Sequence, residues 1–587
     1  MLRERLPQPF FHINTPYSLS GLYTFSSLVL EKLKKMADTK ELATLLDNLL
    51  KLQKSGSLGE IVGQAQRIYH DISDLSVLSG LSTPEMLSPH TSPDVPERVP
   101  SEVNLNNSNP ATDVNEKEKF FDDFAEDYIE FTYKNPTTYH LVQSVAELLK
   151  KSGFEYLPEA ADWSKLFDPE KTGAYFTIRN GTSLAAFTIG SFWSPAKGVG
   201  AIGSHIDALT TKLKPVSNKS KVDGYELLGV SPYAGALSDV WWDRDLGIGG
   251  RVIYKNESSG KLSTTLVNST PHPVAHIPTL APHFGTPSNG PFNKETQAVP
   301  VVGFSDGDDD EKPTEDEQKS PLIGKHSLKL LRYISKLAGV PVSSLIDFDL
   351  DIFDVQKGIR GGLSNEFIYA PRVDDRICSY SAIQSLIRRH KDPESFVTDD
   401  SFNLVALYDN EEIGSLSRQG AKGGLLESTI SRAIAALKIS EPGTLQRLYA
   451  NSVILSADVT HLLNPNFTEV YLEHHKPLPN TGIALALDSN GHMATDLLGK
   501  VVVEQLAKLN DDKVQYFQIR NDSRSGGTIG PSISSSTGAR TIDLGIPQLS
   551  MHSIRATVGY KDVGLAVKFF QGFFKNWRKV VDGIEEF

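Results

Sequence analysis

Sulfur is scarce in this sequence. Cys378 is the single cysteine among 587 residues, so an intramolecular disulfide framework and a metal site built from several thiolates are both excluded. One thiol in so long a chain is consistent with folding in a reducing compartment. Any metal site in this chain therefore has to rely on nitrogen and oxygen ligands.

Long apolar runs and an excess of basic residues are also missing. No stretch approaches the ~20 apolar residues that a membrane span needs, so we expect no span. The net charge of -13 argues against a general binder of nucleic acid or of anionic membranes. Pro7, Pro9 and Pro16 interrupt the start of the chain, where a secretory signal would need an apolar core.

The first zone of the chain, residues 1–119, has the character of an N-terminal extension. Residues 38–54 carry leucines at positions 42, 45, 46 and 49, which is the spacing of an amphipathic helix. Residues 79–115 are rich in proline, serine, asparagine and acidic side chains, which predicts a linker. Met36 is an alternative start, and the sequence leaves that choice open.

The rest of the chain has the composition of a globular protein, with 39% apolar and 22% charged residues. Strand-like segments at 184–191 and 198–207 are followed by turns, short strands and an acidic loop over 209–370. From 371 to 587 strand-like segments alternate with helical ones such as 424–437. This alternation predicts an α/β fold, with a mostly parallel sheet and helices on both faces.

Polar side chains gather where the predicted strands end, and ligands bind at the carboxyl ends of such strands. These candidates are all histidines or carboxylates, which suit zinc, manganese or cobalt in a hydrolytic site. They are His205 and Asp207 in GSHID, Asp374 in RVDD, Glu411 and Glu412 in DNEEIGS, Asp458 in LSADVTH, and His552 in LSMHS.

A charge count favours two metal ions over one. If His205, Asp374, Glu412, Asp458 and His552 all bind, three carboxylates and one hydroxide balance two divalent cations. A single cation would leave excess negative charge in a cleft of low dielectric. In the adjacent pair, one glutamate would bind metal, while Glu411 would stay free to take a proton from water.

Each motif also has a plainer explanation when it is taken alone. His205 could be a hydrogen-bonded histidine of the core, and DNEE could be a solvated turn. The acidic stretch 305–318 is most simply a solvated loop, and its spacing fits no EF-hand. Only the combined set points to a metal hydrolase.

Longer motifs make the sequence similar to a known family. They include GSHIDALTTKLKPVS, DRDLGIGGR, LAPHFG, LYDNEEIGSLSRQGAKGGLLES, LSADVTHLLNPNF, SRSGGTIGPS and LGIPQLSMHSIRA. On these motifs residues 120–587 resemble the aspartyl aminopeptidase family of dinuclear zinc aminopeptidases, and in particular its fungal vacuolar members. The resemblance implies an α/β peptidase domain formed by residues 120–208 and 371–587.

The resemblance also implies the role of each site residue. His205 and Asp458 would hold one Zn²⁺, Glu412 and His552 the other, and Asp374 would bridge them. Glu411 matches the general acid/base, and Asp207 the carboxylate that orients the first histidine. His461 and His283 would contact the peptide substrate, with His283 reaching the site of a neighbouring protomer. Without the family, His283 would be read as an ordinary loop residue.

Assembly and delivery follow from the same resemblance. Residues 209–370 would be an inserted domain that pairs subunits, and the dimers would form a tetrahedral dodecamer. The helix at 38–54 would act as a propeptide that engages a selective-autophagy receptor, after which the enzyme reaches the vacuole lumen. The alternatives are a helix that merely packs on the catalytic body and a cytoplasmic location.

One position departs from the family pattern. Members that prefer acidic N-terminal residues carry a lysine in the segment written GIALALDSNGHMAT here, and that position falls on Ala486. We therefore expect a preference for neutral, apolar residues such as leucine. The alternatives are an acid-specific aspartyl aminopeptidase, another dinuclear exohydrolase such as a carboxypeptidase or deacylase, and a non-catalytic scaffold.

Overall fold

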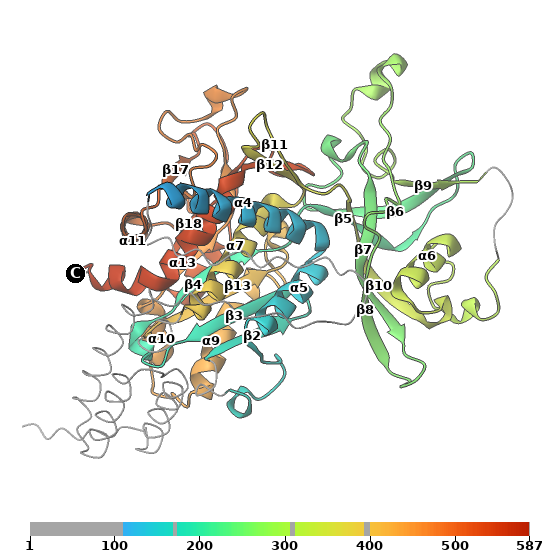
Figure 1. The fold of residues 1–587 in the computed structure, drawn as a ribbon. Coiled ribbons are helices and arrows are strands. Elements are labelled where there is room, and N and C mark those ends of the chain that lie inside the picture. The colour runs from blue at the N-terminus through green and yellow to red at the C-terminus, as the bar shows by residue number, and fades with distance from the viewer. Residues whose placement is uncertain (1–109, 168–172, 306–311, 393–398, 586–587) are drawn as a thin grey trace, which may run out of the picture. The chain divides into compact units, whose positions relative to one another are not determined.

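A computed structural model describes residues 110–167, 173–305, 312–392 and 399–585 (Figure 1). The predicted helix at 38–54 lies outside these residues. Helix α4 (Pro110–Lys134) begins within the stretch predicted as linker. Among the described residues, no helix combines the length and the apolar character needed to cross a membrane.

The central sheet has nine strands, with the order β1-β2-β3-β13-β4-β14-β18-β16-β17. The strands β13, β4, β14 and β18 are parallel neighbours, while β2, β3 and β16 introduce antiparallel pairings. The bounds are β1 (Glu155–Tyr156), β2 (Ala174–Arg179), β3 (Ser183–Ile189), β4 (Gly200–His205), β13 (Phe402–Tyr408), β14 (Val453–Ala457), β16 (Ala484–Leu487), β17 (Gln515–Gln518) and β18 (Arg540–Gly545).

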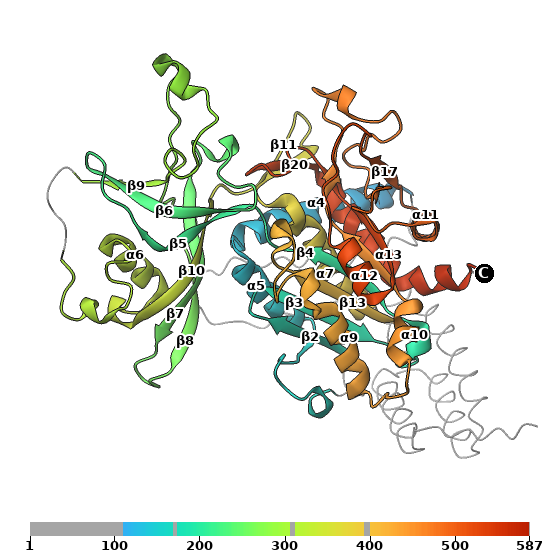
Figure 2. The ribbon, with the colours of Figure 1, turned by 180° about the vertical axis from the view of Figure 1, so that it is seen from behind.

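Helices cover both faces of this sheet, as the sequence predicted (Figures 1 and 2). Alternate residues of each strand point to opposite faces, so on β3 Leu184 joins one apolar core and Ala185 the other. One face packs on α4, α5 (Thr138–Lys151), α7 (Val373–Lys391), α11 (Leu497–Asn510) and α13 (Tyr560–Asp582). The other face packs on α9 (Leu425–Ala436), α10 (Thr444–Ala450) and α12 (Gly530–Thr537).

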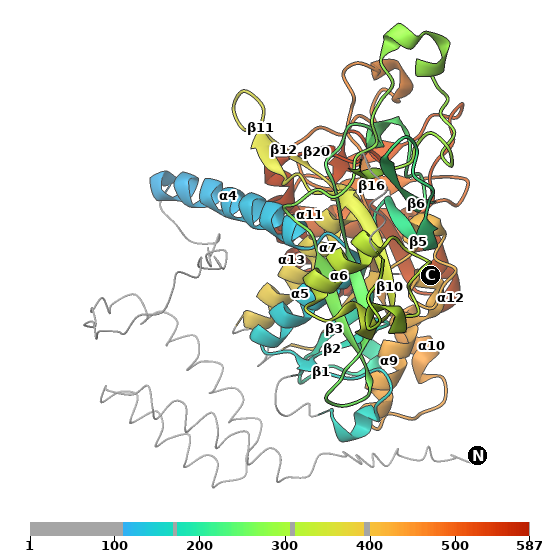
Figure 3. The ribbon, with the colours of Figure 1, turned by 90° about the vertical axis from the view of Figure 1, so that its right-hand side faces the viewer.

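Aromatic side chains join three of these helices, which lie together in Figure 3. Phe124 and Tyr128 of α4 are buried against Tyr380 of α7. The apolar residues of α13, including Phe569 and Phe570, belong to the same core. Apolar residues three or four positions apart lie on one side of a helix, so the aromatic residues of α4 face the core together.

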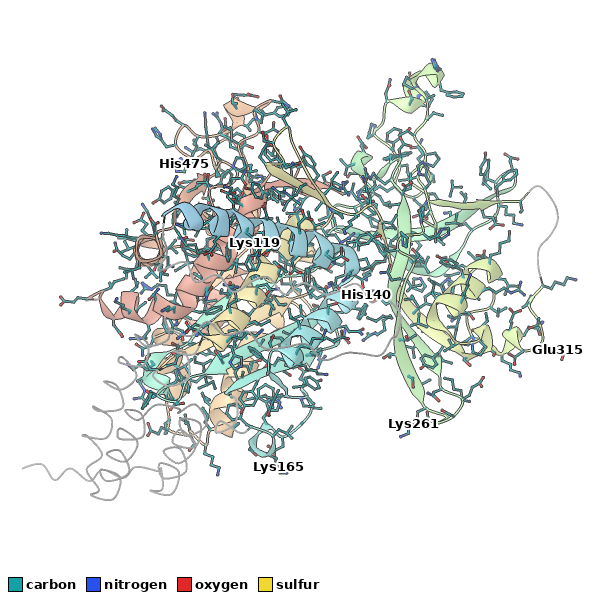
Figure 4. All side chains as sticks on the ribbon, viewed as in Figure 1. Lys119, His140, Lys165, Lys261, Glu315 and His475 are labelled. Atoms are coloured by element: carbon teal, nitrogen blue, oxygen red, sulfur yellow. The ribbon has the colours of Figure 1, made fainter. Side chains whose placement is uncertain are left out.

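A second, antiparallel sheet of six strands has the order β8-β7-β10-β5-β6-β9 and carries helix α6 (Leu328–Ala338). Its strands are β5 (Thr210–Asn218), β6 (Tyr225–Tyr233), β7 (Leu246–Lys255), β8 (Leu262–Asn268), β9 (Val301–Phe304) and β10 (Leu345–Asp354). Lys261, at the turn between β7 and β8, is exposed (Figure 4). All six strands lie within residues 209–370, and the role of that stretch as a dimerisation domain stays a prediction.

Two small sheets complete the described strands. One has the order β11 (Ile359–Gly361), β12 (Phe367–Ala370) and β20 (Ala556–Gly559), and the other pairs β15 (Thr460–His461) with β19 (Pro547–Gln548). Strand β19 ends at Gln548, and the chain then turns at Ser550 and His552, which both have φ of 61°.

A substitution at the contact between β4 and α13 can test how the central sheet packs on that helix. A Cβ atom at Gly200 would collide with the buried indole of Trp577, so we expect Gly200→Ala to destabilise the fold by about 1–3 kcal/mol. Gly583→Ala, at the end of α13, is the matched control because its nearest contact would be 3.4 Å away and its φ is -86°. Thermal or urea unfolding gives the comparison, and equal stability of the two variants would contradict this packing.

Candidate metal centre and active site

Three parallel strands bring most of the predicted site residues to one edge of the central sheet. His205 ends β4, Asp458 follows β14, and Glu411 and Glu412 form the short 3-10 helix η9 (Glu411–Ile413) after β13. Neighbouring parallel strands end at the same edge, so these side chains meet although they are far apart in sequence. Asp374 comes from the start of α7 and His552 from the turn after β19.

Asp374 stands between two pairs of candidate ligands. Its Oδ1 lies 3.1 Å from Nε2 of His205, and the same nitrogen is 3.5 Å from Oδ1 of Asp458. Its Oδ2 lies 3.6 Å from Nε2 of His552, which in turn is 3.7 Å from Oε2 of Glu412. The structure therefore brings the five predicted ligands together, with one oxygen of Asp374 facing each pair.

Several residues at this site have unusual backbone conformations, which set the directions of their side chains. Asp374 has φ -74° and ψ 115°, outside the helical range although it lies within α7, and its peptide bond to Asp375 is cis. Asn410 and His552 have positive φ of 64° and 61°, a region that few non-glycine residues occupy. A side chain at Gly545 would collide with the backbone carbonyl of Asp458, so only glycine fits beside that turn.

Asp207 organises the two glutamates and the histidine. Its Oδ1 accepts the backbone N–H of Glu411 at 3.1 Å, and its Oδ2 accepts that of Glu412 at 3.1 Å. Oδ1 also lies 3.3 Å from Nδ1 of His205. Burial alone would raise the pKa of Asp207, but His205 and these donors hold it below its ordinary value, so Asp207 stays ionised.

Tyr233 and Asn410 extend this network, and the sequence analysis missed both. Tyr233, at the end of β6, donates its hydroxyl to Oδ2 of Asp207 at 2.7 Å. Nδ2 of Asn410 donates to the Tyr233 hydroxyl at 2.9 Å, and Oγ of Ser417 donates to Oδ1 of Asn410 at 2.8 Å. Asn410 stands inside the acidic motif and could have been considered, whereas nothing local marks Tyr233.

Crowding of acidic groups dominates the electrostatics of the site. Burial and the carboxylates of Asp458, Asp207 and Asp374 raise the pKa of Glu411 to about 8. Burial also raises the pKa values of Glu412 and Asp458. Burial would lower the pKa of His205, yet the surrounding carboxylates raise it well above its ordinary value. Such a cluster is stable in its ionised form only when cations compensate it.

The residues present fit divalent cations. Two sets of three side chains bring ligand atoms within 4.8 Å of one another: His205, Glu411 and Asp458, and His205, Asp374 and Glu412. Oε1 of Glu412 is buried and has no hydrogen-bond partner among the described residues. Carboxylate and imidazole ligands without sulfur match zinc and similar ions in hydrolytic sites.

The two histidines predicted to contact substrate lie in different places. His461 on β15 packs on Phe517 with ring centroids 5.0 Å apart, and burial and then His552 lower its pKa. It therefore belongs to the neighbourhood of the site. His283 is exposed in the turn Pro282–Phe284, and the contacts of the described residues do not connect it to the other site residues.

A cavity of about 330 Å³ adjoins the site. Its walls include Asp374, Glu412 and His552, together with residues of the second sheet such as Lys212 and Tyr233. The cluster thus combines carboxylate and imidazole groups, which could hold metal ions, with an adjacent cavity. This combination is what hydrolysis assisted by metal ions requires.

Comparison with known proteins agrees with this chemistry. Residues 131–574 match the family model described as aminopeptidase I zinc metalloprotease (M18). The chain belongs to the M18 family. It is 59% identical over 468 residues to vacuolar aminopeptidase 1 of Saccharomyces cerevisiae. The aligned region covers 79% of this chain and 90% of that protein. The predicted family is confirmed, and the chain is a metalloaminopeptidase.

Solved structures of M18 enzymes share the fold. The crystal structure of prApe1 matches with a TM-score of 0.77 and 59% identity, over 79% of this chain and 97% of that one. The structure of the Saccharomyces cerevisiae mApe1 dodecamer matches with a TM-score of 0.72 and 55% identity, over 80% of this chain and 100% of that one. The α/β fold predicted from the sequence is therefore that of the M18 peptidases.

The crowded carboxylates predict how the metal-free protein responds to pH. Raised pKa values at Glu411, Glu412 and Asp458 mean that their ionisation opposes folding, so stability falls as pH rises above about 4.5. The raised pKa of His205 acts in the same direction, because its favourable charge is lost at high pH. The melting temperature of metal-free protein in chelator should therefore fall between about pH 5 and 8.

Added Zn²⁺ should raise the melting temperature, and by more at pH 8 than at pH 5, because ions and protons compete for the same groups. Metal-free Glu412→Gln should show a shallower fall with pH, since one ionising group is removed. A melting temperature of the unmodified protein that rises across this range would contradict the electrostatic account.

Proposed function

We propose that the chain is an aminopeptidase that works with two Zn²⁺ ions. His205 and Asp458 would hold one ion and Glu412 and His552 the other, with Asp374 shared between them. The observation that carries the proposal is the position of Asp374, whose two oxygens lie 3.1 Å from Nε2 of His205 and 3.6 Å from Nε2 of His552. The charge count from the sequence supports the same number of ions.

The ions, when bound, would supply Lewis-acid chemistry that polarises the scissile carbonyl and acidifies water. Glu411 would take the proton of the attacking water and return it to the leaving amine. Its position supports this role, because its carboxylate lies among the ligand atoms of His205 and Asp458. Asp207 keeps Glu411 in place through the backbone N–H and also orients the His205 ring.

We further propose that the enzyme removes neutral, apolar N-terminal residues such as leucine. Ala486 on β16 is buried and pairs in register with Phe517, whose ring contacts His461. Paired residues of adjacent strands point to the same face, so position 486 faces the side on which His461 lies. Without a cation there, an acidic substrate side chain would lack a charge partner.

Assembly and location belong to the same proposal. The relative in Saccharomyces cerevisiae is named a vacuolar aminopeptidase, and its mApe1 structure is a dodecamer. We propose a similar assembly through residues 209–370, in which His283 reaches a neighbouring protomer's site. Delivery to the vacuole would use the predicted helix at 38–54 and a selective-autophagy receptor.

Glu411→Gln separates catalysis from metal binding. We expect kcat on leucyl peptides to fall by about 100-fold to 10,000-fold, because the proton acceptor is lost, while about two Zn²⁺ per chain are retained. Glu441→Gln, at an exposed glutamate, should change neither quantity. Elemental analysis with steady-state kinetics checks this, and full activity of Glu411→Gln would exclude the assigned role.

Ala486→Lys tests the substrate preference. A lysine at this position would supply a charge partner, so the ratio of kcat/KM for aspartyl over leucyl substrates should rise by at least about 10-fold. Ala486→Met, which adds volume without charge, is the matched control. If the unsubstituted protein already prefers aspartyl substrates, the proposed preference is wrong whatever the variants do.

A further inference from the structure

One buried polar side chain beside the site has no role in the mechanism above. Gln548 on β19 is 1% exposed, and neither Nε2 nor Oε1 of its amide has a hydrogen-bond partner among the described residues. Gln548 is among the residues that line the same cavity as Asp374, Glu412 and His552. A buried amide without a hydrogen-bond partner lowers the stability of the folded protein. We therefore expect a bound ligand to supply the missing hydrogen bonds.

The backbone around Gln548 is held firmly. Its carbonyl accepts the N–H of Leu462 at 2.9 Å, and the strand pairs in register with β15, so that Gln548 is opposite His461. The next residue, Leu549, donates its N–H to Thr557 at 2.9 Å. Because the main chain is paired on both sides, the fold fixes the position of Gln548 in the cavity wall.

The chemistry of the partner follows from the amide. Oε1 of Glu412 is another atom without a partner among the described residues that line this cavity, and a metal ion would satisfy it, but the N–H₂ group of Gln548 cannot bind a cation. The amide needs a group that both donates and accepts. In an extended peptide the N–H and C=O of one residue point to the same side and can be bonded as a pair.

We propose that Gln548 is a substrate-binding residue whose amide hydrogen-bonds the main-chain N–H and C=O of the peptide residue that follows the scissile bond. This inference rests on the proposed function, since it takes a peptide held beside the metal ligands as given. Gln548 would then align the leaving amine with Glu411. It would also contribute to recognition of any peptide, whatever its side chains.

The decisive experiment uses Gln548→Met, which keeps the volume and removes both hydrogen-bonding groups. We expect kcat/KM of the zinc-loaded enzyme on a leucyl tripeptide to fall by about 10-fold to 100-fold, mainly through KM. Zinc content should not change, and the melting temperature should stay the same or rise, because a buried unpaired amide is removed. Gln548→Leu serves as a second variant should the methionine variant fold poorly.

A substrate analogue shows whether the contact is with the main chain. In an ester analogue, oxygen replaces the N–H of the cleaved bond, so the loss caused by Gln548→Met should be several-fold smaller than with the peptide. Asn403→Leu is the matched control, because Asn403 is also buried and unpaired among the described residues but lies at the start of β13 and is absent from the cavity walls. Its kcat/KM should not change.

Two results would overturn the inference. One is an unchanged kcat/KM in Gln548→Met, and the other is an equal loss on peptide and ester. Failure of the proposed function would look different, because the unsubstituted enzyme would then not cleave leucyl peptides or would not depend on Glu411. Activity of the unsubstituted enzyme is therefore measured first.

Discussion

Repulsion between buried carboxylates is the constraint that the catalytic part of this protein has to meet. Asp374, Glu412 and Asp458 gather around His205 at one edge of the central sheet, with Glu411 beside them. Ionised carboxylates repel one another, so they would move apart unless other interactions held them in place. Here β4, β13 and β14 are buried strands between two apolar cores, and the free energy of that packing holds the carboxylates together. The packing of the sheet thus offsets the unfavourable electrostatic free energy of the site.

Asp207 shows how two adjacent glutamates can have separate tasks. One carboxylate accepts both backbone N–H groups, of Glu411 and of Glu412, which holds this short turn in one conformation. The side chains then leave the turn differently, with Glu412 facing His552 and Glu411 facing the pair of His205 and Asp458. A single buried anion therefore orients a histidine, a candidate ligand and a candidate base. Its lowered pKa keeps that anion ionised over the range in which the neighbours titrate.

The sequence predicted strand-like segments that correspond to β3 and β4, and it indicated the five candidate ligands, because both depend on local pattern. Apolar β-rich runs end at polar residues, and a parallel sheet brings such ends together. It failed where the structure depends on contacts between distant segments. The turn at His552 depends on a positive φ that no residue there signals. Tyr233 could not be found, since only the fold brings it to Asp207.

Tyr233 also explains why the second sheet matters to the chemistry. The chain passes from Asp207 into β5 at Thr210, and it returns at the end of β6 with Tyr233, which donates to the same carboxylate. A segment that follows the site directly and bonds back to it cannot move without disturbing Asp207. The second sheet therefore helps to position Glu411 and Glu412 through its hydrogen bond to Asp207. Any contact that subunits make through this sheet would reach Asp207 along the chain that joins it to β5 and through the hydroxyl of Tyr233.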